Sequence, residues 1–243
     1  MASSSTQLEL ETVPSAPVLS VSDAHRWVDL GLILAVVFAG SILGSIYLAF
    51  HPSTPSFSNL RLFTGISDEI LGLLLFLVLF KRQGRHFQDI GLNFQWTDLP
   101  KALGLAVAAR VVMWAIGLVV TYGWFVITRS FPQWPETRAM FSTSSVWLFL
   151  PFLLLNPFFE EILVRGYLMT ELIDLRKSVL LATVASLVVQ TSYHLYYGVA
   201  GAMVVGSGLA VLAIYFAKSR RLMPVILAHM LWDSTALLGF LHR

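Results

Sequence analysis

The chain has 243 residues, of which 56% are hydrophobic and 12% are charged, and its mean hydropathy is +0.74. A soluble domain carries about 25% charged residues, so this composition excludes an ordinary soluble globular protein. The absence of cysteine excludes disulfides, thiolate metal sites and a cysteine nucleophile. The net charge of +2, with basic residues scattered between apolar runs, gives no nucleic-acid-binding pattern.

The first 24 residues differ in composition from the rest of the chain. They are rich in Ser, Thr and Pro and have no apolar periodicity, which predicts a disordered polar tail on the cytoplasmic side. No basic segment leads into a short apolar stretch with a cleavage site, so we do not expect a secretory signal peptide.

From residue 25 to residue 243 the chain is a succession of apolar runs, which predicts a single transmembrane domain. Helices satisfy their own backbone polar groups in lipid, and about 20 apolar residues suffice to cross it. We therefore predict an all-α polytopic bundle of about seven spans, or eight if one segment is re-entrant. The predicted spans cover residues 27–50, 64–80, 101–128, 145–175, 178–197, 199–217 and 222–241.

The distribution of Lys and Arg orients this bundle. Ten of the 16 basic residues fall on one side and four on the other, so the positive-inside rule places the N-terminus in the cytoplasm of a multi-pass cell-membrane protein. The two remaining basic residues, Arg110 and Arg165, lie within spans. The ten are Arg26, Lys81, Arg82, Arg85, Lys101, Arg176, Lys177, Lys218, Arg220 and Arg221.

The connector 83–100, QGRHFQDIGLNFQWTDLP, leaves two alternatives open. It is either an interfacial segment with Phe87, Ile90, Leu92 and Trp96 at the level of the lipid headgroups, or an ordinary loop with one aromatic belt residue.

Ionisable residues inside the spans are the candidates for function, because each costs at least about 2.5 kcal/mol at a helix centre. Arg110 would pair with a carboxylate, bind an anionic substrate group or extend toward the membrane surface. The candidates are Arg110, Glu160, Glu161, Arg165, His194, His229 and Asp233.

The stretch NPFFEEILVRGYL, residues 156–168, holds three of these charges. Glu161 and Arg165 are four residues apart, so a helix places them on one face, where they neutralise each other. Glu160 is rotated by about 100° from Glu161, which leaves it without a local partner. An unpaired carboxylate in a cavity can act as a general base, whereas a purely structural cluster would lock two helices together.

His229 and Asp233 are also four residues apart, in the last span, and His194 lies near the end of the fifth. Together with Glu160, two histidines and an aspartate can activate a water molecule and stabilise an oxyanion. The same residue types ligate divalent metals, and Glu160, His194 and His229 would be the ligands of a zinc ion. The zinc-protease motif H-E-x-x-H is absent, and the sequence leaves both chemistries open, with no cofactor or with one divalent metal.

These motifs resemble the CAAX prenyl protease and bacteriocin-processing (CPBP) family, the type II CAAX endopeptidase-like intramembrane proteases. The family pattern is E-E-x-x-x-R, F-x-x-x-H and H-x-x-x-(N or D), in that order on separate spans. The resemblance covers about residues 85–240, with a catalytic core at about 145–240, and departs from the pattern at Gln190, where the family has an aromatic residue. The matching residues are Glu160, Glu161 and Arg165, then His194, then His229 and Asp233.

The resemblance implies a role for each matching residue. Glu160 would activate water, His194 and His229 would position it and stabilise the oxyanion, and Asp233 would support them. Glu161 and Arg165 would hold the helices in place.

The implied activity is endopeptidase cleavage of a membrane-associated protein or peptide, prenylated or not. The implied partners are this substrate and membrane lipids, and no nucleic acid is expected to bind. Two alternatives remain: an inactive immunity or scaffold protein on the same fold, and a proton-coupled transporter. The lack of an inverted repeat disfavours the transporter.

Overall fold

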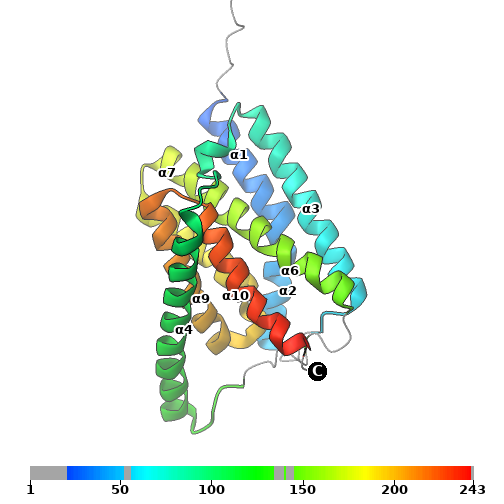
Figure 1. Cartoon of the computed structure of the whole chain (residues 1–243), viewed down its shortest axis with the longest axis vertical. Coiled ribbons are helices and arrows are strands. Elements are labelled where there is room, and N and C mark those ends of the chain that lie inside the picture. The colour runs from blue at the N-terminus through cyan, green and yellow to red at the C-terminus, as the bar shows by residue number, and fades with distance from the viewer. Residues whose placement is uncertain (1–20, 52–55, 134–139, 141–144, 242–243) are drawn as a thin grey trace, which may run out of the picture.

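Figure 1 shows the computed structural model, which describes residues 21–51, 56–133, 140 and 145–241. The predicted tail lies outside the described residues as far as residue 20. Within the described residues the secondary structure is entirely helical, which confirms the predicted all-α class. The elements, with η marking short 3₁₀ or π segments, are α1 (Asp23–Ile33), η1 (Leu34–Phe38), α2 (Ala39–Phe50), α3 (Asn59–Arg82), η2 (Phe87–Ile90), α4 (Asp98–Thr128), α6 (Val146–Glu160), η3 (Glu161–Met169), α7 (Thr170–Arg176), α8 (Val179–Tyr193), η4 (Leu195–Tyr197), α9 (Gly198–Ser219) and α10 (Met223–Leu241).

Helical stretches occupy the positions of all seven predicted spans. Five of them are long and apolar enough to cross a membrane, while Val179–Tyr193 is apolar but shorter. These helices make the chain a multi-pass membrane protein. The five long stretches are Asp23–Phe50, Asn59–Arg82, Asp98–Thr128, Val146–Arg176 and Leu195–Ser219.

Serine side chains begin several of these helices. Ser22, Ser58, Ser145 and Ser178 each accept a hydrogen bond from a backbone N–H in the first turn of the following helix. Such caps satisfy amide donors that have no partner within the helix.

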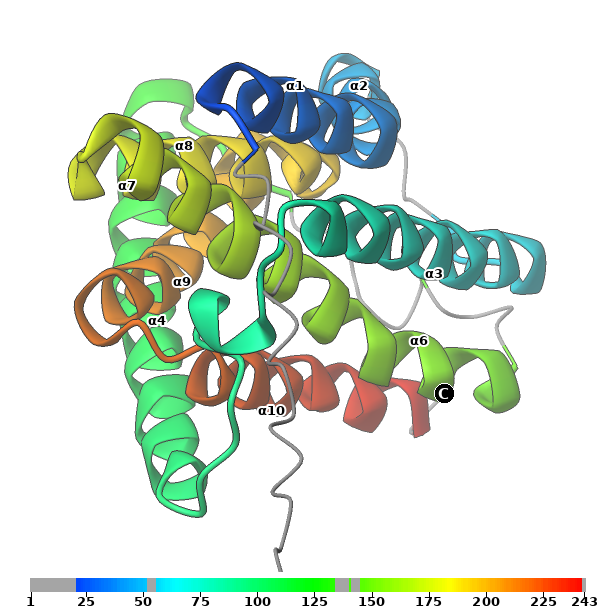
Figure 2. The same cartoon turned by 90° about the horizontal axis from the view of Figure 1, so that it is seen from above.

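The stretch Val146–Arg176, formed by α6, η3 and α7, lies at the centre of the bundle. In Figure 2 α6 runs between α3 on one side and α10 on the other. Its most apolar window is 44% buried, compared with 17% for the windows of Asp23–Phe50 and Asp98–Thr128. The most heavily charged apolar stretch of the sequence is therefore also among the most enclosed, and the outer helices present their apolar side chains to lipid.

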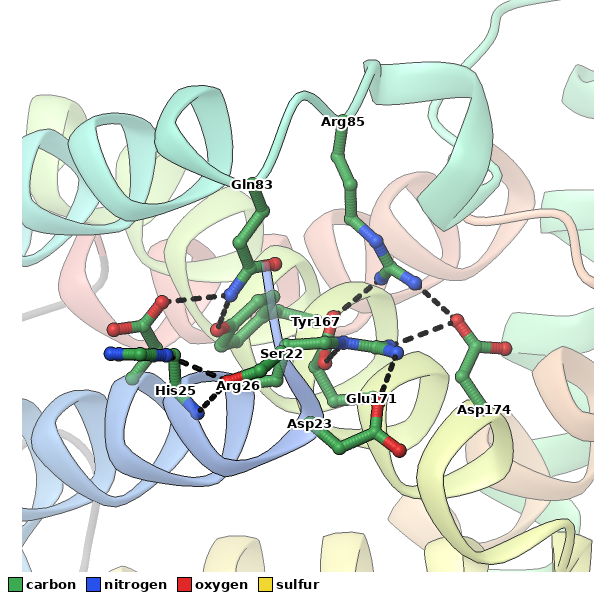
Figure 3. Close-up of polar contacts among 10 residues, drawn as sticks. Ser22, Asp23, His25, Arg26, Gln83, Arg85, Tyr167, Glu171 and Asp174 are labelled. Atoms are coloured by element: carbon green, nitrogen blue, oxygen red, sulfur yellow. Dashed lines mark hydrogen bonds and ion pairs between the residues drawn. The ribbon is translucent and has the colours of Figure 1, made fainter. Parts of the chain in front are cut away.

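At one end of the bundle, a buried cluster of charges ties three segments together (Figure 3). Glu171 of α7 is fully buried and accepts hydrogen bonds from Arg26 Nε of α1 at 2.8 Å and from Arg85 Nη1 of the connector at 2.5 Å. Both arginines also pair with Asp174. Two acids and two bases neutralise one another here, so the cluster holds α1, the connector and α7 together.

A second group of contacts lies beside this cluster. Gln83 Nε2 donates to Tyr167 Oη at 3.0 Å (Figure 3) and to Asp29 Oδ2 at 3.0 Å. Arg82 pairs with the same aspartate. Basic residues that the sequence places on one side of the membrane are thus found together at one end of the fold.

The connector between α3 and α4 folds back onto the bundle. Ile90 is fully buried within the protein, whereas Trp96 is 79% exposed. The backbone carbonyl of Gly91 accepts a hydrogen bond from Leu222 N at 2.9 Å. Gly91 has a φ of +73°, and a Cβ atom there would stand 2.0 Å from the carbonyl oxygen of Arg220. This close approach fixes the connector against the turn between α9 and α10.

Candidate functional site

Glu160 is the last residue of α6 and is almost completely buried. Asn156 lies one helical turn before it, so the two side chains share a face. At Glu161 the hydrogen-bonding pattern changes from α to π, and this wider helix continues to Met169. Wide turns of this kind occur frequently at functional sites. The change falls between the two adjacent glutamates of the site.

Two side-chain amides join the carboxylates of the site into a chain. Asn156 Nδ2 donates to Glu69 Oε1 of α3 at 2.9 Å and to Glu160 Oε1 at 3.2 Å. Gln190 Nε2 of α8 donates to Glu160 Oε2 at 2.9 Å and approaches Glu161 Oε1 at 3.5 Å. Each oxygen of Glu160 is therefore held by an amide, and the carboxylate is fixed in orientation.

Glu161 is fully buried and, besides the contact with Gln190, has two charged or titratable partners. Its Oε2 lies 3.3 Å from Arg165 Nε, so the predicted ion pair within one helix is present. Its Oε1 lies 2.8 Å from Nδ1 of His229 on α10. Arg165 also donates to the carbonyl oxygen of Leu209 on α9 at 3.1 Å. Glu161 and Arg165 thus link the central helix to α9 and α10.

The two histidines are oriented by acceptors. A carboxylate and a carbonyl only accept, so Nδ1 of His229 donates to Glu161 and Nδ1 of His194 donates to the backbone oxygen of Gln190 at 2.8 Å. The Nε2 atom of each ring is left for other contacts. Nε2 of His229 lies 3.6 Å from Asp233 Oδ1, which is too long for a hydrogen bond. Glu161, rather than Asp233, therefore orients this imidazole.

One large cavity receives the predicted catalytic side chains. Its volume is about 1280 Å³, and α2, α3, α4, α6, α8, η4, α9 and α10 all contribute to its walls. Glu161 and Arg165 do not line it; they lie behind its wall. The four predicted catalytic residues that do line it are Glu160, His194, His229 and Asp233.

The described residues do not fit the predicted metal site. Among them, no three His, Asp or Glu side chains gather closely enough to hold one metal ion. The carboxylate oxygens of Glu160 instead take amide donors. We therefore derive no step through a metal.

The structure corrects one expectation about Glu160. The sequence predicts no local partner for it, but Asn156 is such a partner, four residues earlier in the same helix. Among the described residues its hydrogen-bonding partners are amides, not histidines. Gln190, which departs from the family pattern, is one of these partners.

Glu69 is a residue that the sequence prediction misses. It is 6% exposed and lines the cavity, and its Oε2 has no hydrogen-bonding partner among the described residues. It falls within the predicted span 64–80, so the rule that selects ionisable residues inside spans would have found it.

Comparison with known proteins finds a family model that matches the part of the chain holding this site. Residues 142–235 match the family model described as Rce1-like, type II CAAX prenyl endopeptidase Rce1-like. The matched segment includes Glu160, Glu161, Arg165, His194, His229 and Asp233. No curated protein and no solved structure matches the chain.

Proposed function

We propose that this chain, which belongs to the CAAX protease family through residues 142–235, is an intramembrane endopeptidase whose general base is Glu160. The family supports a peptidase of the CAAX type that acts on a peptide or protein. The main observation behind these residue roles is which of the motif residues line the cavity and which do not. Glu160, His194, His229 and Asp233 line the cavity, while Glu161 and Arg165 are fully buried behind it.

Glu160 is suited to activate water because its carboxylate is held in place at the cavity surface. In the proposed reaction it takes a proton from a water molecule, whose oxygen attacks the carbonyl carbon of the peptide bond. The carbon–nitrogen bond then breaks, and Glu160 returns the proton to the leaving amine. General-base catalysis of this kind contributes about 10²- to 10⁴-fold to a rate.

The two histidines would assist at the reacting oxygen atoms. With Nδ1 fixed as a donor, Nε2 of each ring accepts a hydrogen bond from water when the ring is neutral. It donates to the oxyanion when the ring is charged. Asp233 lies close to Nε2 of His229 and would help to hold the same water. Glu161 and Gln190 are positioning residues, because each acts through a residue that lines the cavity.

The substrate and the location form part of the proposal. The family description supports a prenylated peptide as the first substrate to test. The concentration of paired basic residues at one end of the bundle supports a cytoplasmic N-terminus in a lipid-embedded cell-membrane protein.

The test is hydrolysis of a fluorogenic farnesylated peptide by purified protein in detergent micelles. We expect Glu160→Gln to lower kcat by at least about 100-fold, because an amide cannot accept the proton. Asp68→Asn is the matched control, since Asp68 also lines the cavity but makes no hydrogen bond to the residues of the site. Full activity of Glu160→Gln would overturn the proposal. A wild type that is inactive on both prenylated and unprenylated peptides would instead favour the scaffold alternative.

A second measurement separates the two chemistries that the sequence leaves open. Because the proposed water activation uses side chains of the protein and no metal ion, dialysis against a chelator is expected to leave kcat unchanged. Loss of activity that added zinc restores would contradict the metal-free form of the mechanism.

A further inference from the structure

Arg110 places a positive charge in the wall of the same cavity. It lies on α4, is half-buried, and lines the cavity together with Glu160 and His229. Its Nη2 donates to Thr235 Oγ1 of α10 at 3.0 Å, and its guanidinium carbon lies 5.7 Å from the centroid of the Trp232 ring. Both contacts are to neutral groups.

Two ordinary roles of an arginine in an apolar helix, a place at a helix end and an ion pair, do not apply here. At 1.5 Å per residue, Arg110 lies about 18 Å from the first residue of α4 and about 27 Å from the last, so it is not at a helix end. Nor is it neutralised by a contact, because among the described residues no carboxylate lies within 4.0 Å of its nitrogens. Asp233 attracts it only from farther away.

The guanidinium is nevertheless held in a definite orientation. The Trp232 ring supports one face, and Thr235 takes one of its five N–H groups, which leaves other donors of the planar fork for a ligand. A carboxylate is the group that such a fork binds with two parallel hydrogen bonds. A partly buried cation that no carboxylate contacts has charge available for an anionic ligand.

We propose that Arg110 is a substrate-binding residue that takes a carboxylate of the peptide, so that the cavity selects peptides carrying a negative charge near the cleaved bond. The inference rests on the proposed endopeptidase function. A peptide offers such a carboxylate either at its C-terminus or on an Asp or Glu side chain. A C-terminal carboxylate anchored at Arg110 would make the enzyme prefer bonds near the end of the chain.

The test compares kcat/KM for pairs of farnesylated fluorogenic peptides that differ in a single carboxylate. In the first pair, the same peptide ends in a free acid or in a carboxamide. In the second pair, both peptides are amidated and the last residue is Asp or Asn. We expect the wild type to favour the acid of one pair by about 10- to 100-fold, the range for a hydrogen bond to a charged group.

Arg110→Gln is expected to bring that ratio close to one. Arg110→Lys keeps the charge but loses the planar guanidinium, so we expect an intermediate ratio. Arg61→Gln is the matched control, because Arg61 also lines the cavity and stacks on a ring, that of Phe57. It should keep the wild-type ratio.

The pair in which the ratio collapses identifies the source of the carboxylate. A wild-type ratio near one in both pairs, or a ratio that survives in Arg110→Gln, would overturn the inference. So would a collapse in Arg61→Gln instead. A ratio is measured only on folded, active enzyme, so these outcomes leave the role of Glu160 intact, whereas an active Glu160→Gln would refute the proposed function itself.

Discussion

Replacing Gln190 with leucine tests whether the amide chain holds Glu160 in position. Leucine is similar in size to glutamine and fits a site that is fully buried, but it has no donor for the carboxylates. The bond from Gln190 Nε2 to Glu160 Oε2 is 2.9 Å long, while the contact to Glu161 Oε1 at 3.5 Å is at the outer limit of a hydrogen bond. We therefore treat the substitution as the loss of one bond to a carboxylate.

The expected magnitude follows from that bond. A hydrogen bond to a charged group contributes about 1.5–3 kcal/mol, and polar contacts between membrane helices reach about 1.7 kcal/mol. We expect Gln190→Leu to lower the free energy of unfolding by about 1.5–2 kcal/mol. We expect kcat to fall by about 10- to 30-fold, since about 1.4 kcal/mol corresponds to a factor of ten.

The assay combines unfolding of the protein in mixed micelles with hydrolysis of the farnesylated peptide. Ser186→Ala is the control, because Ser186 lies one turn earlier on the same helix, is fully buried, and its hydroxyl has no hydrogen-bonding partner among the described residues. We expect it to change stability by less than about 0.5 kcal/mol. If Gln190→Leu loses no more than Ser186→Ala in both measurements, the amide does not position Glu160.

Two further predictions concern Glu69 and Gly91. Glu69→Gln keeps an oxygen that accepts from Asn156, so kcat should stay within about threefold of the wild-type value. Glu69→Leu loses that bond and should reduce kcat about tenfold. Equal losses in the two variants would show that the charge matters rather than the contact. Gly91→Ala should lower the melting temperature by about 4–8 °C, corresponding to roughly 2 kcal/mol, because the backbone has a positive φ and the new methyl group would meet the carbonyl of Arg220. Gly104→Ala in α4 is its control, since a Cβ there has nothing within 4 Å, and equal melting temperatures for the two variants would contradict the account of the connector.

The sequence predicts the parts of the site that depend on spacing along one helix. Four-residue spacing places Glu161 beside Arg165, and the structure has them 3.3 Å apart. Apolar length predicts the helices, and the CAAX-type motifs predict the family that residues 142–235 match. These predictions succeed because they use local geometry, or motifs that lie in a fixed order along the chain.

The contacts of Glu160 could not be predicted in the same way. Asn156 and Gln190 are neutral, so a search for costly charges inside spans passes over them. The contact between Gln190 and Glu160 also requires the packing of α8 against the central helix, which no periodicity specifies. The pairing of His229 with Glu161 rather than Asp233 depends on how α10 packs, although four-residue spacing favours the aspartate.

The wide π segment at residues 161–169 links the two polar regions of the central helix through its winding. Its first turn sets Glu161 toward His229, and the residues that follow it, Glu171 and Asp174, meet Arg26 and Arg85 at the end of the bundle. The direction in which a helical side chain points depends on how many residues each preceding turn contains. The direction of the Glu171 side chain around the helix axis therefore depends on the wide turns before it. Rewinding this segment to an α-helix would rotate Glu171 and Asp174 away from both arginines. It would also shift Glu161, which lies behind the cavity wall. The winding of one nine-residue segment thus sets the alignment of the cavity wall and of the ion pairs that hold α1 and the connector.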